Sequence, residues 1–213
     1  MRRRLTVALI VIIVSMLACA RLTRQPPADE KQARQDFTYG EMRDLLARTS
    51  SFSCQMKFQE RGEAEVTSEV VPPDRSHTVA RARFADLLDK EVIVIGSSVY
   101  ELQGGAAKWE TRSVETGRTN VDDFMNGYFG YMIPLYYYPL KLAGTEVLDG
   151  TTALVYEDSG SPQNPELHYL KAWVRASDRL PLKVVFNNKD MKPRCTAKFY
   201  DYDKKIKIEP PSM

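Results

Sequence analysis

Apolar and polar residues alternate in many short segments of this chain, and this period of two is typical of strands that bury one face of a sheet. Phe52, Cys54, Met56 and Phe58 alternate with polar residues in the first such segment. The same pattern or a short apolar run predicts further strands at residues 64–71, 77–84, 91–103 (a hairpin), 106–114, 145–150, 151–159, 167–176, 180–188 and 195–203. So many short strands joined by short turns predict a largely antiparallel sheet.

A helix is expected before the first strand. Thr38 and Glu41 form a capping-box pattern, and Met42, Leu45 and Leu46 recur on one helical face. The helix should end before Ser50 and Ser51.

A second helical region interrupts the strands after residue 119. Asn120 is expected to cap it, with Asp122 and Asp123 in the first turn, where negative charge is favoured. Pro134 interrupts the helix, and a short further helix is expected from there toward Leu142. The chain is therefore expected to have an α+β fold, with helices over one face of a strongly curved antiparallel sheet.

The first 20 residues resemble an export signal. Three arginines precede an apolar run at residues 5–17, which is short for a membrane span, and Ala18-Cys19-Ala20 follows. Residues 16–19 resemble a bacterial lipobox, which predicts a signal peptide at 1–18, lipidation of Cys19, a flexible tether at 19–36 and a folded domain at 37–213. Cleavage after Ala20, giving a soluble periplasmic or secreted protein, and an uncleaved anchor are the alternatives. The predicted location is the cell envelope, on a membrane facing the periplasm or the cell exterior.

Cys54 and Cys195 remain once Cys19 is assigned to a lipid. An even pair in an oxidising compartment, on the apolar faces of the first and last strands, predicts a disulfide between them. Two buried free thiols are the alternative.

Composition and motifs indicate a protein without a catalytic centre. Loss of the signal's three arginines takes the formal charge from +2 to −1, which argues against a nucleic-acid partner. His77 and His168 lack partners at motif spacing, and the sequence contains no phosphate-binding loop, nucleophile elbow or zinc motif. We therefore expect no enzyme activity, no metal and no cofactor.

The stretch FGYMIPLYYYPLKL at residues 129–142 is unusually apolar and aromatic. Its tyrosines have an apolar body and a polar tip, which suits a site that is part dry and part wet. Together with the helix before it, this stretch offers a candidate lining for an apolar pocket, although plain core packing explains the same pattern. The candidate ligand-binding residues are Phe124, Met125, Tyr128, Phe129, Tyr131, Met132, Ile133, Leu135 and Tyr138.

Four segments in order resemble a known family. PPDRSHTVARARF, EVIVIGSSVYELQGGAAKWE, LKAWVRASDRLPLKVVF and CTAKFYDYDKKIKIEPP are similar to motifs of the LolA/LppX/LprG group of bacterial lipoprotein and lipid carriers. The match covers roughly residues 52–211. The resemblance implies an open β half-barrel closed by an N-terminal helix and a helical lid, with a cavity that accepts acyl chains and no catalysis.

The resemblance and the apolar stretch at residues 129–142 together predict non-catalytic binding or transport of a lipid or acylated lipoprotein in the bacterial envelope. The partners would be an acyl-chain ligand, a membrane through the lipid anchor, and an envelope protein. The alternative is a scaffold or stress-sensing protein whose half-barrel is filled by its own side chains. A filled interior would be accompanied by an apolar patch outside.

Overall fold

The computed structural model describes residues 36–59, 63–82, 89–114, 119–128, 139–158, 169–188 and 190–212, except the side chains of residues 126–128. The chain divides into two units, 1–34 and 35–213, and every described residue belongs to the second. The predicted signal peptide, Cys19 and all of the tether except residue 36 lie outside the described residues.

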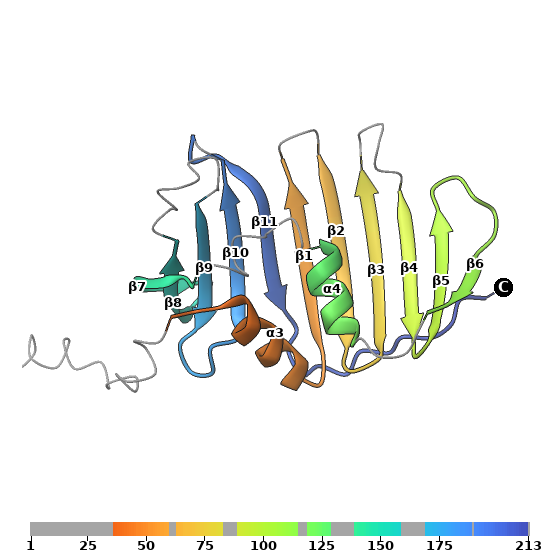
Figure 1. Cartoon of the computed structure of the whole chain (residues 1–213), viewed down its shortest axis with the longest axis horizontal. Coiled ribbons are helices and arrows are strands. Elements are labelled where there is room, and N and C mark those ends of the chain that lie inside the picture. The colour runs from red at the N-terminus through yellow and green to blue at the C-terminus, as the bar shows by residue number, and fades with distance from the viewer. Residues whose placement is uncertain are drawn as a thin grey trace, which may run out of the picture. The chain divides into compact units, whose positions relative to one another are not determined.

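The described residues form one antiparallel sheet of eleven strands in the order β6-β5-β4-β3-β2-β1-β11-β10-β9-β8-β7 (Figure 1). The strands are β1 (Phe52–Phe58), β2 (Ala64–Val71), β3 (Arg75–Ala82), β4 (Lys90–Ile95), β5 (Ser98–Gln103), β6 (Glu110–Ser113), β7 (Lys141–Leu148), β8 (Thr151–Glu157), β9 (Leu170–Arg175), β10 (Pro181–Asn187) and β11 (Pro193–Tyr200). The order begins at β6 and ends at β7, so the sheet is open. This confirms the predicted antiparallel sheet.

The central pairing joins the two ends of the domain. β1 pairs with β11, with Met56 opposite Ala197. Strands β2 to β6 follow in order on the side of β1, and strands β10 to β7 follow in order on the side of β11. A sheet built this way has two halves, β1–β6 and β7–β11, which meet at the β1–β11 pair.

Two helices, α3 (Tyr39–Arg48) and α4 (Asn120–Tyr128), lie over the same face of the sheet (Figure 1). We call this the helix-side face. It buries Phe52, Cys54 and Met56 of β1 and their cross-strand neighbours on β2 and β11. The other face buries a smaller cluster on β8–β10, made by Ala153, Val155, Trp173 and Val185.

The start of α3 is as predicted. The Thr38 hydroxyl accepts a hydrogen bond from the Glu41 amide at 3.1 Å, and Tyr39, Met42 and Leu46 are buried. The helix stops at Thr49, whose amide and hydroxyl both donate to the Leu46 carbonyl. The capping residue and apolar spacing therefore identified this helix correctly.

The start of α4 differs from the prediction. Thr119, rather than Asn120, caps the helix, because its hydroxyl accepts from the Asp122 amide at 3.2 Å. The Asn120 side chain is buried and donates its amide hydrogens to the carbonyls of Val71 and Arg75, at either side of the β2–β3 turn. Asn120 thus ties the helix to the sheet, a role that local spacing could not reveal.

The predicted continuation of a helix to Leu142 is wrong at its end. Leu140 forms a bridge with Phe37, and β7 begins at Lys141. Leu140 and Phe37 exchange two backbone hydrogen bonds of 2.9 and 3.0 Å. At Leu140 the backbone therefore pairs with the segment before α3 instead of forming helical hydrogen bonds.

The structure does not show the predicted disulfide, and Cys54 and Cys195 are both free and buried in it. Cys54 lies opposite Phe199, and Cys195 lies opposite Phe58. The two cysteines are thus offset by four residues along the paired strands, which is about 13 Å, whereas a disulfide needs Cα atoms within about 7 Å. Burial raises the pKa of the Cys195 thiol to about 12 and that of Cys54 well above its usual value.

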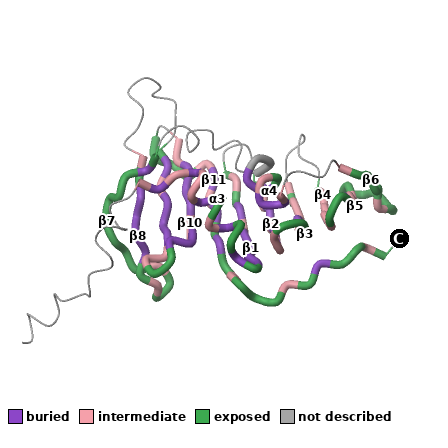
Figure 2. Tube along the Cα trace, turned by 60° about the horizontal axis from the view of Figure 1, so that its bottom comes forward, coloured by how far each residue is buried: buried purple, intermediate pink, exposed green. Residues whose placement is uncertain are grey.

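After β11 the chain passes the ends of several strands as an extended segment (Figures 1 and 2). The Ser51 hydroxyl donates to the Lys204 carbonyl, and the Asp203 carboxylate accepts from the Ser50 amide at 2.7 Å. Farther along, Ile208 is buried and its carbonyl accepts from Arg75 at 3.3 Å. This segment therefore connects the end of β11 to β3.

Candidate functional site

Aromatic side chains from three elements meet beneath α4 on the helix-side face. The rings of Phe52 and Phe124 are 5.5 Å apart in an edge-to-face arrangement, and those of Phe124 and Phe199 are 6.5 Å apart. All three residues are buried. Such pairs contribute beyond their area alone, so this cluster fixes α4 against β1 and β11.

Two of the predicted ligand-binding residues belong to this buried region. Phe124 is 4% exposed and Met125 is fully buried, so both contribute to the interior under α4. The side chain of Tyr128 and the residues Phe129, Tyr131, Met132, Ile133, Leu135 and Tyr138 lie outside the described part of the chain. Their binding role stays a prediction.

The apolar surface of the helix-side face continues beyond α4 onto β3, β4 and β5. Ala80 of β3 lies opposite Val66 of β2, and Val99 of β5 lies opposite Val94 of β4, so these residues share the helix-side face. Val99 is buried, whereas Ala80, Val92 and Val94 are only partly buried. We call the four residues Ala80, Val92, Val94 and Val99 the apolar floor.

A charged pair marks one end of the apolar floor. Lys90 and Glu101 lie on the same face as Val92, and their charged groups are 2.6 Å apart. The hydrogen bond from Lys90 lowers the pKa of the Glu101 carboxyl. An apolar surface with a polar rim is the usual composition of a site for amphipathic ligands.

A buried polar cluster lies at the other side of this face, under α3. Arg179 is 4% exposed and donates to the Glu41 carboxylate at 2.5 Å and to the Tyr156 hydroxyl at 2.6 Å. Burial raises the pKa of the Tyr156 phenol. Since Glu41 is in the first turn of α3, this cluster ties the helix to β8 and to the turn between β9 and β10.

His77 does not belong to this site. His77 lies on β3 and points away from the helices, with its Nε2 2.8 Å from Glu91, and His168 is outside the described residues. Within the described ranges, no group of three or more His, Cys, Asp or Glu side chains is arranged to hold a metal ion. The apolar floor offers apolar contact, with the charged pair Lys90–Glu101 at its rim.

Among the described residues, no helix is both long and apolar enough to cross a membrane. The predicted signal segment lies outside these residues.

Comparison with known proteins gives a likeness of structure. No protein-family model matches the chain. No curated protein matches it either. Among solved structures, LprF from Mycobacterium bovis has a TM-score of 0.52 at 11% identity, covering 83% of this chain and all of that one.

Two further solved structures match with lower scores. A MucA/MucB complex from Pseudomonas aeruginosa has a TM-score of 0.41 at 16% identity, covering 76% of this chain and 53% of the matched one. A LolA superfamily protein from Nitrosomonas europaea has a TM-score of 0.26 at 11% identity, covering 79% of this chain and 94% of the other. The likeness to LprF supports the open antiparallel sheet that the sequence predicted, and it shows the fold alone.

Proposed function

We propose that this protein binds a lipid or an acylated ligand without catalysis in the bacterial cell envelope. The observation that supports the proposal most directly is the apolar floor. Ala80, Val92 and Val94 lie near one another on the helix-side face and keep part of their apolar surface exposed, and contiguous exposed apolar surface is typical of ligand-binding grooves. The LolA-like fold agrees with this function.

In this proposal the acyl chain lies on the apolar floor and the insertion at residues 129–138 closes over it as a lid. The predicted ligand-binding residues of the insertion would supply the opposite wall. Pro134 and Pro139 interrupt helical hydrogen bonding and would let the lid hinge. The Lys90–Glu101 pair at the rim would face the polar end of the ligand.

Export and lipidation at Cys19 complete the proposal. An anchored protein would hold its apolar site close to a membrane that supplies or receives the ligand. The polar tether at 19–36 has two prolines and would let the domain move relative to its anchor.

A second candidate function is an envelope scaffold or stress-sensing interaction protein. Burial of Phe124 and Met125 favours it, because these two candidate ligand contacts are already covered by the chain itself. In that case the interior would be filled, and an envelope protein would be the functional partner.

Native mass spectrometry distinguishes the two functions. The unit starting at residue 35 would be exported in an envelope-containing host, purified without detergent, and measured before and after solvent extraction. Bound acyl lipid in near-stoichiometric amounts supports the carrier. A mass equal to that of the chain alone, with no uptake of added lipid, contradicts it and favours the scaffold.

Substitutions in the apolar floor make the test specific. Val94→Asp places a carboxylate against the proposed acyl chain, and burying an unpaired charge there should reduce bound lipid by roughly tenfold or more. Val79→Asp is the matched control, since Val79 is also partly buried but lies on the opposite face of the neighbouring strand. Equal loss in both variants would indicate general destabilisation and contradict binding at the floor.

A further inference from the structure

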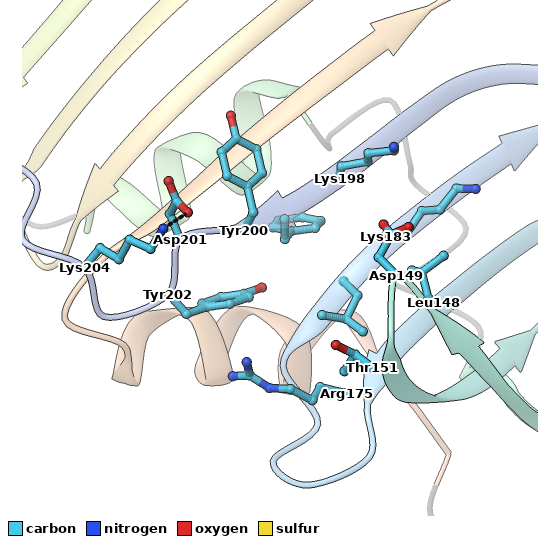
Figure 3. A pocket seen from close by; sticks show the side chains of 12 residues that line it. Leu148, Asp149, Thr151, Arg175, Lys183, Lys198, Tyr200, Asp201, Tyr202 and Lys204 are labelled. Atoms are coloured by element: carbon cyan, nitrogen blue, oxygen red, sulfur yellow. Dashed lines mark hydrogen bonds and ion pairs between the residues drawn. The ribbon is translucent and has the colours of Figure 1, made fainter.

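A hollow of about 500 Å³ lies on the sheet face opposite the helices, over β9, β10 and β11 (Figure 3). Its walls come from the β7–β8 turn at Asp149 and from the segment that follows β11. The hollow is separate from the apolar floor, because the sheet itself lies between them.

Two lysines on adjacent strands line the hollow. Lys183 of β10 and Lys198 of β11 are direct cross-strand partners, and their neighbours Val184 and Ala197 are buried on the helix-side face. Figure 3 shows the two side chains side by side, extending in the same direction. Like charges at directly opposed positions are unfavourable. Within the described part of the chain, neither ammonium forms an ion pair with a carboxylate.

The other charges of the hollow are largely compensated. Arg175 pairs with Asp178 at 2.7 Å, and Lys204 pairs with Asp201 at 2.5 Å. Asp149 is the remaining carboxylate in the lining. The lining itself therefore holds four cationic side chains and two carboxylates, and the Glu146 carboxylate just outside it also interacts with the charge of Lys183.

Lys183 is held in place by an aromatic ring. Its ammonium is 4.8 Å from the ring centroid of Trp173, which is 9% exposed. The Trp173 indole in turn donates to Glu146 at 2.7 Å. A cation–π contact restrains the lysine without neutralising its charge, so the ammonium remains available to an anion.

The hollow also offers apolar contacts beside the charges. The apolar part of the lining is made by Leu148, Leu182 and Tyr202. The Tyr202 hydroxyl donates a hydrogen bond to the Pro181 carbonyl, which fixes the orientation of the ring. A ligand that contacts both the lysines and these apolar side chains would have a compact anionic group next to a hydrocarbon group.

We propose that this hollow is a binding site for a phosphate ester, with the phosphate held between the ammonium groups of Lys183 and Lys198. Both a soluble phosphate ester and the head group of an anionic phospholipid have this chemistry. The site lies on the other face of the sheet from the proposed acyl site and does not depend on it.

Trp173 provides the readout. The chain has two tryptophans, so Trp109→Phe leaves Trp173 as the single tryptophan, whose fluorescence is excited selectively over that of the tyrosines. The full chain with this substitution, in dodecyl maltoside micelles, would be titrated at constant ionic strength with inorganic phosphate, with glycerol 3-phosphate, or with micelles containing phosphatidylglycerol. We expect a saturable change in Trp173 fluorescence that chloride does not produce.

The double substitution Lys183→Gln and Lys198→Gln should weaken phosphate binding by about tenfold or more, since it removes two charge-assisted contacts. Because loss of Lys183 also alters the surroundings of Trp173, binding would be measured in parallel by calorimetry. The control is Lys57→Gln with Lys192→Gln, which makes the same charge change at exposed positions outside the hollow. This control should change affinity by less than about twofold, because surface charges outside the hollow act only through a screened field.

The three titrants identify the source of the phosphate. Tighter binding to phosphatidylglycerol micelles assigns the site to a lipid head group, and equal or tighter binding to glycerol 3-phosphate assigns it to a soluble ester. A response equal to that of chloride, or equal losses in the double variant and its control, would overturn the proposal. Lysine variants that unfold at a lower temperature yet keep their phosphate affinity would overturn it as well.

Discussion

The guanidinium of Arg179 is almost fully buried just before β10, and the backbone there has a φ of 62°. A non-glycine residue in this left-handed region is uncommon, and the surrounding contacts must hold it there. Arg179 donates to Glu41 and to Tyr156, and its side chain lies 5.8 Å from the Phe37 ring centroid. One side chain thus fastens α3 and the segment before it to the sheet.

Glu41→Gln should therefore lower the free energy of unfolding by about 2 kcal/mol, because it removes the carboxylate charge that pairs with the buried guanidinium of Arg179. Urea denaturation followed by circular dichroism measures the change. Asp44→Asn on the same helix is the control, since Asp44 pairs with Arg43 at an exposed position and should cost less than about 1 kcal/mol. Equal effects would contradict the role assigned to Arg179.

The two buried thiols predict a loss of stability in alkali. Burial raises the pKa of both thiols above the value of about 8.5 that unfolded cysteine has. The unfolded state therefore loses protons first as pH rises, so the stability that the neutral thiols contribute is fully present below about pH 8.5. It is lost progressively as the pH rises above that value, up to about 12 for Cys195.

From pH 8 to pH 9.5 we expect the wild type to lose about 1 kcal/mol per thiol relative to a variant with Cys54→Ala and Cys195→Ala. Urea denaturation at the two pH values gives the difference. Parallel pH profiles for the two proteins would show that the thiols ionise equally in the folded and unfolded states, contrary to this prediction.

At the scale of elements, α4 depends on two adjacent residues with different tasks. Thr119 caps the helix, and Asn120 donates to two carbonyls at the β2–β3 turn. Asn120 is 3% exposed, so the two carbonyls would lose their partner in a buried setting.

Asn120→Ala should consequently lower the free energy of unfolding by about 2 kcal/mol, whereas Asp123→Asn, at an exposed position in the same turn, should cost under about 1 kcal/mol. Thermal and urea unfolding would measure both. An effect of Asn120→Ala no larger than that of Asp123→Asn would mean that the amide bonds to the sheet contribute nothing to stability.

At the scale of the whole described domain, the segment after β11 joins the two halves of the sheet. It contacts Ser50 and Ser51 before β1 and reaches Arg75 of β3, where Ile208 is 4% exposed. Such a segment limits how far the ends of the strands can separate in an open sheet.

Ile208→Ala should lower the free energy of unfolding by about 2 kcal/mol or more, because it removes a buried side chain. Amide hydrogen exchange should increase at the start of β3 but not in β9. Ile206→Ala, at a less buried position of the same segment, is the control. Unchanged exchange in β3 would contradict the proposed connection.

Sequence patterns determined much of this domain because strands and helices leave local signals. The alternation in β1 and β11, the cap and apolar stripe of α3, and the antiparallel class follow from residues close together in the chain. The candidate site could be predicted only in part. The apolar insertion was visible in the sequence, whereas the apolar floor arises from single residues on three strands.

Features that depend on the register between distant strands appear only in the folded domain. The β1–β11 pairing separates Cys54 from Cys195, and the β10–β11 pairing brings Lys183 beside Lys198. The role of Asn120 likewise needs a turn some 45 residues earlier. Periodicity fixes which face a side chain takes, but the position along the partner strand is set by hydrogen bonds and packing across the whole sheet.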